Sequence, residues 1–482
     1  MYHLSLLELL NKIDSWETNS KEVFDLFLQR IHDYNTKLWA FISADREWFH
    51  QSNAVLQWLP IWVKDIFAQK NTKTQWASIM LQDFQPPYDA TVIQKLKTAW
   101  MSSIWNLNMD EFAMGSSTKH SAILETKNPW WNNRIPGGSS GWSAAAVAAW
   151  LCPAALGTDT WGSLRQPASL CWVVGFRPSY WRNSRFWVFP MASSFDVPGT
   201  ITKTVRDAWV LYDIMNGEDE FENTSLTWKH LLPKKLWDKK DLQWIKVWVP
   251  AQYFADWLEI WVKETIQTAI QELQDLWAKI IDVSLPLTKY AIAAYYIIVP
   301  AEVSTNLARY DGIRYGHMSA EAQKNLDELY LKNRGEWLGD ESQKRSVVGS
   351  YVLSSGFYDA YFMKAAKVRT RIIQEFNEVF EQVDVIIGPA SPRVAWKLDE
   401  VWQDPLQEYL ADMYTVPSSL AGLSGISVPC GFAKSDDTEQ ETLPVGLQII
   451  SQRLNEETLL QVAHVYEEST WWSKQMIPPN YK

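Results

Sequence analysis

Residues 136–165 read PGGSSGWSAAAVAAWLCPAALGTDTWGSLR. Two loops of small, serine-bearing residues, 137–143 and 157–163, flank an alanine-rich segment that predicts a helix from about Ser143 to Trp150. Glycine lets backbone N–H groups come close to a bound group, and a helix that starts just after such a loop adds a positive end. The pattern therefore predicts a site for a developing oxyanion, with a serine as candidate nucleophile.

Four short motifs in and around this stretch resemble the amidase signature family. They are residues 137–141 (GGSSG), 157–160 (GTDT), 162–167 (GSLRQP) and, upstream, 60–65 (PIWVKD). Ser139 and Ser163 lie 24 positions apart, which also fits that family. A serine-rich glycine loop alone is more often a phosphate cradle or a plain turn, so the interpretation depends on the length of the match.

The resemblance implies a Ser–Ser–Lys triad, with Ser163 as nucleophile, Ser139 as proton relay and Lys64 as base. An amide is a poor electrophile, so the attacking hydroxyl must lose its proton as it attacks. Lys64 acts as a base only when it is neutral, which requires burial or neighbouring positive charge to lower its pKa. The apolar neighbours Ile61 and Val63 make burial reasonable. In the family, the relay serine follows a cis peptide bond.

The same resemblance implies an oxyanion hole made of backbone N–H groups. Its residues would be Thr160, Trp161, Gly162 and Ser163. Loss of one such donor typically raises the activation barrier by about 2.7–4 kcal/mol. Trp161 keeps its N–H but places an indole at the rim of the pocket. Asp159 and Arg165 are predicted to support this loop rather than to act on the substrate.

Segments outside the shared motifs resemble the A subunits of tRNA-dependent amidotransferases, a branch of that family. These segments are residues 104–115, 306–316, 353–361 and 409–412. The resemblance implies a glutamine site formed by Arg345, Asp412 and a tyrosine of the Tyr295–Tyr296 pair, with Tyr295 preferred. A guanidinium suits the free α-carboxylate, and a carboxylate suits the α-ammonium. An amidase acting on neutral amides would not need this pair.

That branch implies a glutaminase whose ammonia passes to a partner subunit, which activates a tRNA-bound carboxylate with ATP. The expected partners are B-type and C-type subunits in a heterotrimer, and the expected acceptor is Glu-tRNA, Asp-tRNA or both. No cofactor is expected on this chain, because ATP and Mg²⁺ are used by the partner. Two alternatives remain open at this stage: a free-standing amidase, and a catalytically impaired scaffold subunit.

Composition bounds the class of protein. The chain has 482 residues, 47% of them hydrophobic, and a net charge of −11, which disfavours direct nucleic-acid binding and suits a partner that holds the tRNA. Its three cysteines match no zinc or disulfide framework, which is typical of a reducing cytoplasm. We expect neither a signal peptide nor a membrane span, and hence a cytoplasmic protein.

The pattern along the chain predicts an α/β fold in one large domain, with a mixed central sheet covered by helices on both faces. Residues 1–58 are expected to be helical, 59–218 to hold the catalytic core, and 219–482 to complete the sheet and the glutamine-binding helices. A strand at 245–250, a helix with Val262, Ile266, Ile270 and Leu273 on one face, and a strand at 279–285 predict a parallel βαβ unit. The pattern also predicts helices at 290–296, 323–331, 350–376 and 456–467, strands at 384–388, 425–429 and 445–450, and a hairpin tip at 435–441.

One number is abnormal. Tryptophan occurs 29 times and glycine only 20 times, although average usage would give about 34 glycines. Trp142 and Trp161 interrupt the two signature loops, Trp62 precedes the lysine, and Trp277 stands where a helix would end in glycine. We hypothesise that the gene uses a code in which UGA means glycine, so that most of the surplus tryptophans are glycines. Trp130 is the candidate for a genuine tryptophan.

Overall fold

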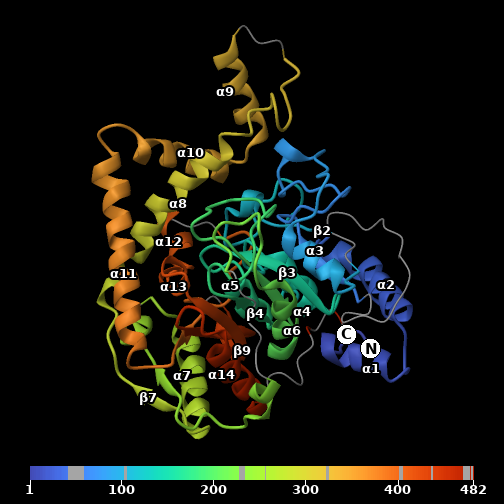
Figure 1. The fold of residues 1–482 in the computed structure, drawn as a ribbon, viewed down its shortest axis with the longest axis vertical. Helices are drawn as coiled ribbons and strands as arrows, with labels where there is room; N and C mark the ends of the chain where they lie inside the picture. The colour runs from blue at the N-terminus through green and yellow to red at the C-terminus, as the bar shows by residue number, and fades with distance from the viewer. Residues whose placement is uncertain are drawn as a thin grey trace.

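One mixed sheet of ten strands runs through the molecule (Figure 1). The computed structural model describes residues 1–41, 59–102, 106–226, 234–255, 257–321, 325–400, 405–435 and 438–470, together with Pro478 and Tyr481. In order across the sheet, the strands are β2 (Asn106–Leu107), β1 (Ile61–Lys64), β3 (Ala154–Asp159), β5 (Val197–Thr202), β4 (Val174–Arg177), β9 (Ser424–Ser435), β10 (Thr438–Ser451), β8 (Val385–Pro389), β6 (Lys246–Trp248) and β7 (Lys279–Ile281).

The sheet is parallel at its two ends and antiparallel in its centre. Strands β2, β1 and β3 run parallel to one another, as do β8, β6 and β7. Strands β5, β4, β9 and β10 join the two ends through antiparallel pairings. Parallel neighbours need a crossover, and antiparallel neighbours such as β9 and β10 need only a hairpin. The arrangement confirms the predicted mixed sheet.

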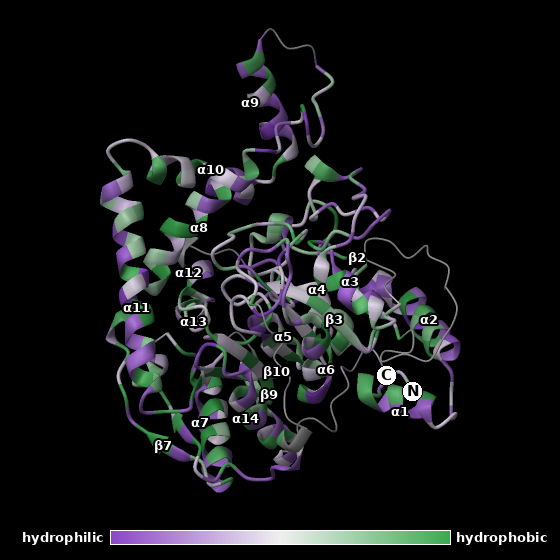
Figure 2. Ribbon diagram, viewed as in Figure 1, coloured by the Kyte–Doolittle hydropathy of each residue, from purple (hydrophilic) through white to green (hydrophobic). Residues whose placement is uncertain are grey.

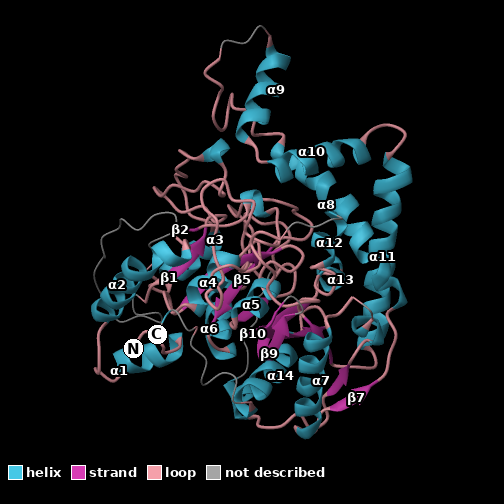
Figure 3. Ribbon diagram, turned by 180° about the vertical axis from the view of Figure 1, so that it is seen from behind, coloured by secondary structure: helices cyan, strands magenta, loops and turns pink. Residues whose placement is uncertain are grey.

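Helices cover the sheet on both sides (Figure 3). The described α-helices are α1 (Leu6–Asp14), α2 (Ser20–Leu38), α3 (Thr91–Thr98), α4 (Gly141–Ala148), α5 (Arg165–Cys171), α6 (Val205–Met215), α7 (Ile260–Asp275), α8 (Ala291–Leu307), α9 (Leu326–Trp337), α10 (Asp340–Leu353), α11 (Lys364–Phe380), α12 (Pro405–Leu410), α13 (Val416–Leu420) and α14 (Glu456–Ser469). In β8, Ile386 packs into one apolar cluster, while its neighbours Val385 and Ile387 pack into a second. Both faces of the sheet are therefore buried, as predicted.

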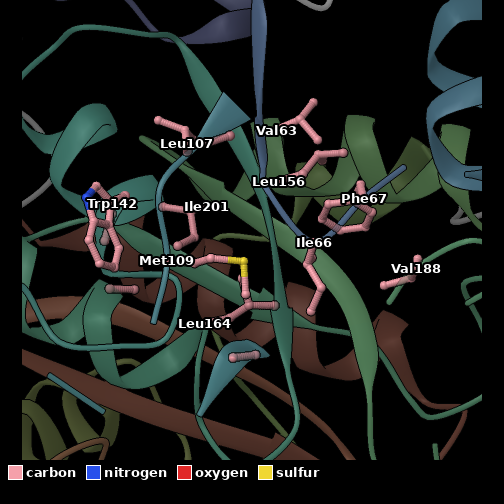
Figure 4. Packing of buried hydrophobic residues seen from close by; sticks show 14 of the residues in the cluster. Val63, Ile66, Phe67, Leu107, Met109, Trp142, Leu156, Leu164, Val188 and Ile201 are labelled. Carbon is pink, nitrogen blue, oxygen red and sulfur yellow. The ribbon is translucent and has the colours of Figure 1, made fainter. Parts of the chain in front are cut away.

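The core next to the signature loops is packed from neighbouring strands. Val63 of β1, Leu156 of β3 and Ile201 of β5 are fully buried, and Met109 and Leu164 fill the space beside them (Figure 4). Strand β1 is buried along its whole length, as expected for a parallel strand covered on both faces. This packing carries the last residue of β1, Lys64, into the interior.

Local sequence explains several helix boundaries. Helix α1 begins with a capping box, in which the Ser5 hydroxyl accepts the Glu8 N–H and the Glu8 carboxylate accepts the Ser5 N–H. Helix α11 alternates polar and apolar residues along its length (Figure 2) and buries Ile372, Phe376 and Val379. The predicted βαβ unit is confirmed as β6–α7–β7, with parallel pairing. On α7, Val262, Ile266 and Leu273 are buried together with Ala269, and the predicted Ile270 is half-buried against the same cluster.

Some predicted boundaries are wrong. The single helix expected over 350–376 is two, because the chain turns after α10 at Ser354, and Gly356 has φ +88°; a π-helical turn (Tyr358–Met363) then precedes α11. Helix α8 continues to Leu307 through Pro300. The tip expected at 435–441 is mostly strand, because β10 begins at Thr438; residues 436–437 lie outside the described chain.

Tryptophan dominates the left-handed backbone positions. Of the sixteen described non-glycine residues with positive φ, ten are tryptophan. They are Trp16, Trp39, Trp76, Trp100, Trp150, Trp172, Trp181, Trp187, Trp244 and Trp277. Trp39 and Trp172 hold the C-cap positions of α2 and α5, with φ 58° and 68°. Bulky residues are outliers in this region, whereas glycine is the usual residue there. The distribution supports the glycine hypothesis.

Trp62, Trp142 and Trp161 differ from these ten in their backbone. None of the three has positive φ. All three side chains are instead buried among other residues. Any effect of glycine at these positions would therefore come from side-chain volume and not from backbone strain. Among the helices that the structure describes, none combines the length and the apolar run that a membrane crossing requires.

We predict that Trp277→Gly stabilises the protein by about 1–2 kcal/mol, the usual cost of a left-handed L-residue. Trp277 has φ 72° and is 74% exposed, so the change relieves the backbone with little loss of packing. Urea unfolding of the parent and of Trp277→Gly gives the difference in the free energy of unfolding from the shift of the midpoint. The control is Trp257→Gly, because Trp257 is 63% exposed but does not have positive φ. Equal shifts for the two variants would contradict the backbone argument.

Candidate active site

The three predicted catalytic residues come from adjacent strands and the loops that follow them. Lys64 is the last residue of β1, and β3, its parallel neighbour, ends at Asp159. Ser163 lies in the turn between β3 and α5, and Ser139 lies just before α4. The carboxyl ends of parallel neighbours meet at one edge of a sheet, which is where ligands of such sheets bind. The topology thus brings the base and the nucleophile loop to one place.

Lys64 is completely buried and surrounded by hydroxyl groups. Its Nζ donates to Ser139 Oγ at 2.8 Å, to Ser140 Oγ at 3.0 Å and to Thr158 Oγ1 at 3.1 Å. Burial lowers the pKa of Lys64 to about 7, against the opposing influence of Asp110, Asp159 and Asp196. Within the described chain, no carboxylate lies within ion-pair distance of Nζ. A substantial fraction of this lysine is therefore neutral near pH 7, as a base must be.

Ser163 lies against the loop that carries Ser139. The N–H of Ser140 donates to the Ser163 carbonyl at 3.3 Å, and the Gly138–Ser139 peptide bond is cis, as it is in the family. Ser163 Oγ is buried and has no hydrogen-bond partner among the described residues. Gly162, just before it, has φ +150°, and a Cβ there would lie 2.2 Å from Thr415 Oγ1. Only glycine fits this position, so the turn presents bare backbone.

The four residues predicted for the oxyanion hole form this turn. Thr160 Oγ1 donates to Asp196 at 2.7 Å, which fixes the start of the turn. The backbone N–H groups of residues 161–163 donate to no acceptor in the part of the chain that the structure describes. They are therefore available for an oxyanion, although no contact here tests that role. The assignment stays a prediction.

Asp159 and Arg165 form a buried ion-pair network beneath the turn. Asp159 accepts from Arg165 Nε at 2.9 Å and from Arg177 Nε at 3.1 Å. Burial opposes ionisation of Asp159, but the two arginines hold its pKa below the usual value. Arg165 also donates to Ser418 and Gln448, and so ties the turn to α13 and β10. These contacts are those of supporting residues.

The predicted glutamine-binding residues meet beside the turn. Tyr295 lies on α8, Arg345 on α10, and Asp412 follows α12. All three are buried. The Trp161 ring contacts Tyr295 edge-on, with ring centroids 5.3 Å apart, and the Arg345 guanidinium carbon lies 5.0 Å from its centroid. Tyr296 also faces Arg345, at 5.6 Å.

The two charged groups of this pocket are each held by one neighbour. Arg345 Nε donates to Glu341 Oε1 at 2.7 Å, and the Ser116 hydroxyl donates to Asp412 Oδ2 at 2.6 Å. Arg345 Nη1 and Asp412 Oδ1 are buried and have no hydrogen-bond partner among the described residues. Burial raises the pKa of Asp412 to about 7, against the opposing influence of Ser116 and the Trp161 indole. A cationic ligand group would favour its ionised form.

Sequence reasoning missed four residues of the site. Ser140 and Thr158 bind Lys64, Ser116 holds Asp412, and Glu341 holds Arg345. Ser140 and Thr158 stand inside the quoted motifs, and Glu341 lies four residues before Arg345 on one helix, so spacing could have found them. Ser116 gave no such signal, because its partner is 296 residues away.

One group of potential metal ligands occurs among the described residues, and it lies outside this site. His464, Glu467 and Glu468 of α14 have ligand atoms within 4.8 Å of one another. Both oxygens of Glu467 accept the Val205 N–H at 3.1 Å, at the start of α6. The contact explains Glu467 as a helix cap.

The fold, and the meeting of Lys64, Ser139 and Ser163 at one edge of the sheet, fit a serine-dependent amidase. The chain belongs to the amidase family, because the sequence profile described as Amidase matches residues 22–460. The chain is similar to the A subunit of glutamyl-tRNA(Gln) amidotransferase from Thermoanaerobacter pseudethanolicus, with 44% identity over 97% of each chain. It is 43% identical to the protein of that name from Nitrosococcus oceani, over the full length of both.

Solved structures agree with this assignment. In the crystal structure from Thermotoga maritima, the A subunit of glutamyl-tRNA(Gln) amidotransferase superposes with a TM-score of 0.84 and 38% identity, over 99% of this chain and 98% of that one. The structure of 6-aminohexanoate cyclic dimer hydrolase superposes with a TM-score of 0.80 at 20% identity, over 99% of both chains. That second likeness shows the shared fold alone.

We predict that kcat/KM for amide hydrolysis rises with pH through about 7 and then levels off. Lys64, with its pKa lowered to about 7, is charged below that value and cannot accept a proton. Initial rates measured from about pH 5.5 to about pH 9 test this. Lys64→Met should abolish the rate at every pH. A profile that stays flat across this range would contradict the assignment of Lys64 as the base.

Proposed function

We propose that this chain is the glutamine-hydrolysing subunit of a tRNA-dependent amidotransferase. The observation that carries the proposal is the meeting of Arg345 and Asp412, each with one unpartnered buried atom, beside the Ser163 turn. A free α-amino acid has the matching carboxylate and ammonium. A free-standing amidase for neutral amides would leave Arg345 Nη1 and Asp412 Oδ1 without partners, at a cost of about 1–3 kcal/mol each. The names of the relatives point the same way.

In the proposed reaction, neutral Lys64 draws a proton from Ser163 through the Ser139 hydroxyl. Ser163 Oγ bonds to the carboxamide carbon of glutamine, and N–H groups of the 160–163 turn take the oxyanion charge. Collapse breaks the C–N bond, and the proton returns to the leaving nitrogen to give ammonia. Water then attacks the γ-glutamyl ester by the same relay, which releases glutamate and restores Ser163.

The ammonia would pass to a partner subunit rather than to solvent. We propose B-type and C-type subunits as partners in a heterotrimer, with the misacylated tRNA held mainly by the partner. ATP and Mg²⁺ serve the activation of the tRNA-bound carboxylate there, and this chain needs no cofactor for glutamine hydrolysis. The choice between Glu-tRNA(Gln) and Asp-tRNA(Asn) as acceptor belongs to the partner. The net charge of −11 suits that division.

Ser163→Ala should abolish glutamine hydrolysis and glutamine-dependent tRNA amidation, with a loss on the order of 10⁴–10⁶-fold. Amidation with free ammonium should survive, because that chemistry belongs to the partner. Release of glutamate and formation of amidated tRNA by the complex are the readouts. Ser143→Ala is the matched control, because the Ser143 hydroxyl on α4 donates to the Leu156 carbonyl and not to Lys64. Glutaminase activity near the parent's in Ser163→Ala would sink the nucleophile assignment.

Arg345→Ala should raise KM for glutamine by an amount equivalent to about 2–5 kcal/mol, because it leaves the substrate carboxylate unpaired in a buried pocket. Asp412→Ala should act similarly through the ammonium. Hydrolysis of a small neutral amide should change little. The control is Lys344→Ala, which removes the adjacent charge on α10, where the side chain is half exposed. Equal losses for both substrates would indicate collapse of the fold and count against specific recognition.

A further inference from the structure

Trp161 stands among the groups that would receive the amino acid. Its side chain is fully buried. Tyr295 contacts one side of the indole edge-on, and the Arg345 guanidinium lies over its ring at 5.0 Å. Two residues further along the chain is Ser163. The indole therefore occupies the space between the nucleophile turn and the arginine.

The indole does not satisfy the polar groups around it. Arg345 Nη1 is a donor and Asp412 Oδ1 is an acceptor, and both are buried without a hydrogen-bond partner among the described residues. An indole offers one donor and no acceptor, so it cannot pair with Arg345 except through its ring face. Trp161 Nε1 lies close enough to lower the pKa of Asp412, yet it makes no well-formed hydrogen bond in the described chain. A ligand that carries a carboxylate and an ammonium would supply the partners that these two atoms lack.

We propose that residue 161 decides whether the amino-acid pocket is open. Tryptophan fills the space between Arg345 and Tyr295, whereas glycine at the same backbone position leaves that space to the α-carboxylate and α-ammonium of glutamine. Trp161 does not have positive φ, so the effect acts through side-chain volume alone. The inference rests on the proposed function and names the residue that controls entry of its substrate.

The wider pattern of tryptophans supports glycine at this position in the working enzyme. Ten left-handed positions are held by tryptophan, where glycine is the expected residue. Trp130 is buried like Trp161, but its indole N–H donates to the Cys171 carbonyl at 3.0 Å, whereas Trp161 Nε1 has no hydrogen-bond partner among the described residues. The hydrogen bond of Trp130 is what we expect of a native tryptophan. Trp161 instead fills space next to polar atoms that lack partners.

The experiment uses a chain with glycine at Trp62, Trp142 and the ten tryptophan positions of positive φ. It compares tryptophan at residue 161 with Trp161→Gly in that chain, each prepared with its partner subunits. L-Glutamine is the probe, in calorimetric titration and in glutamate release. Trp161→Gly should raise kcat/KM for glutamine at least about 100-fold, because the ligand then gives Arg345 Nη1 and Asp412 Oδ1 their missing partners. Adding Arg345→Ala to Trp161→Gly should remove the gain. Trp130→Gly is the control and should give no gain.

Two results separate this inference from the proposed function. If Trp161→Gly hydrolyses small neutral amides in a Ser163-dependent way but gains nothing with glutamine, the inference is overturned while the amidase chemistry stands. If glutamine binding strengthens without any Ser163-dependent hydrolysis, the inference holds and the proposed function fails.

The chain as printed, made with tryptophan throughout, is expected to be insoluble or inactive, because about five overpacked sites at about 1–3 kcal/mol each would exhaust the stability of a typical domain. If the printed chain is insoluble or inactive, peptide mass spectrometry of the protein from its native source shows whether residue 161 is tryptophan or glycine. Glycine at 161 supports the inference. Tryptophan at 161 in a protein that hydrolyses glutamine overturns it, and with it the hypothesis that UGA is read as glycine.

Discussion

The site depends on the burial of one amine. Lys64 loses its hydration on folding and receives three hydroxyl groups in exchange, with no carboxylate at ion-pair distance among the described residues. Hydroxyls accept from an ammonium but also tolerate a neutral amine, whereas a paired carboxylate would keep the lysine charged. Strand β1, buried along its length, carries that side chain into the interior. The hydroxyl groups of Ser139, Ser140 and Thr158 surround the amine there.

The sequence was sufficient for the parts of the site that lie within contiguous motifs. Lys64, Ser139 and Ser163 could be predicted because each stands in a short segment whose residue types have few other uses. The neighbour of β4 in the sheet is β9, about 250 residues later, and nothing local specifies that pairing. Ser116 was missed for the same reason. Long-range pairings are decided by the fit of the whole core, which no local pattern contains.

The helix expected at 350–376 shows a different limit. Apolar residues continue at helical spacing on both sides of Ser354–Gly356, so periodicity alone joins what the backbone separates. The tryptophans show a third limit of prediction from sequence. Their excess over glycine was visible in the composition, and ten of them do lie at positive φ. Trp62, Trp142 and Trp161 do not lie at positive φ, so at these positions the backbone angle does not distinguish glycine from tryptophan.

The hydrogen bonds of Arg165 join segments that the ribosome synthesises at very different times. Its guanidinium contacts Asp159 on one side and Ser418, Ser419 and Gln448 on the other. The turn that carries Ser163 is thus fastened to segments that leave the ribosome some 250 residues later. A nascent chain that ends before α13 contains the whole triad yet lacks Ser418, Ser419 and Gln448, which hold Arg165. The catalytic residues are thus encoded early in the chain, while the contacts that hold the nucleophile turn can form only after most of the chain has been made.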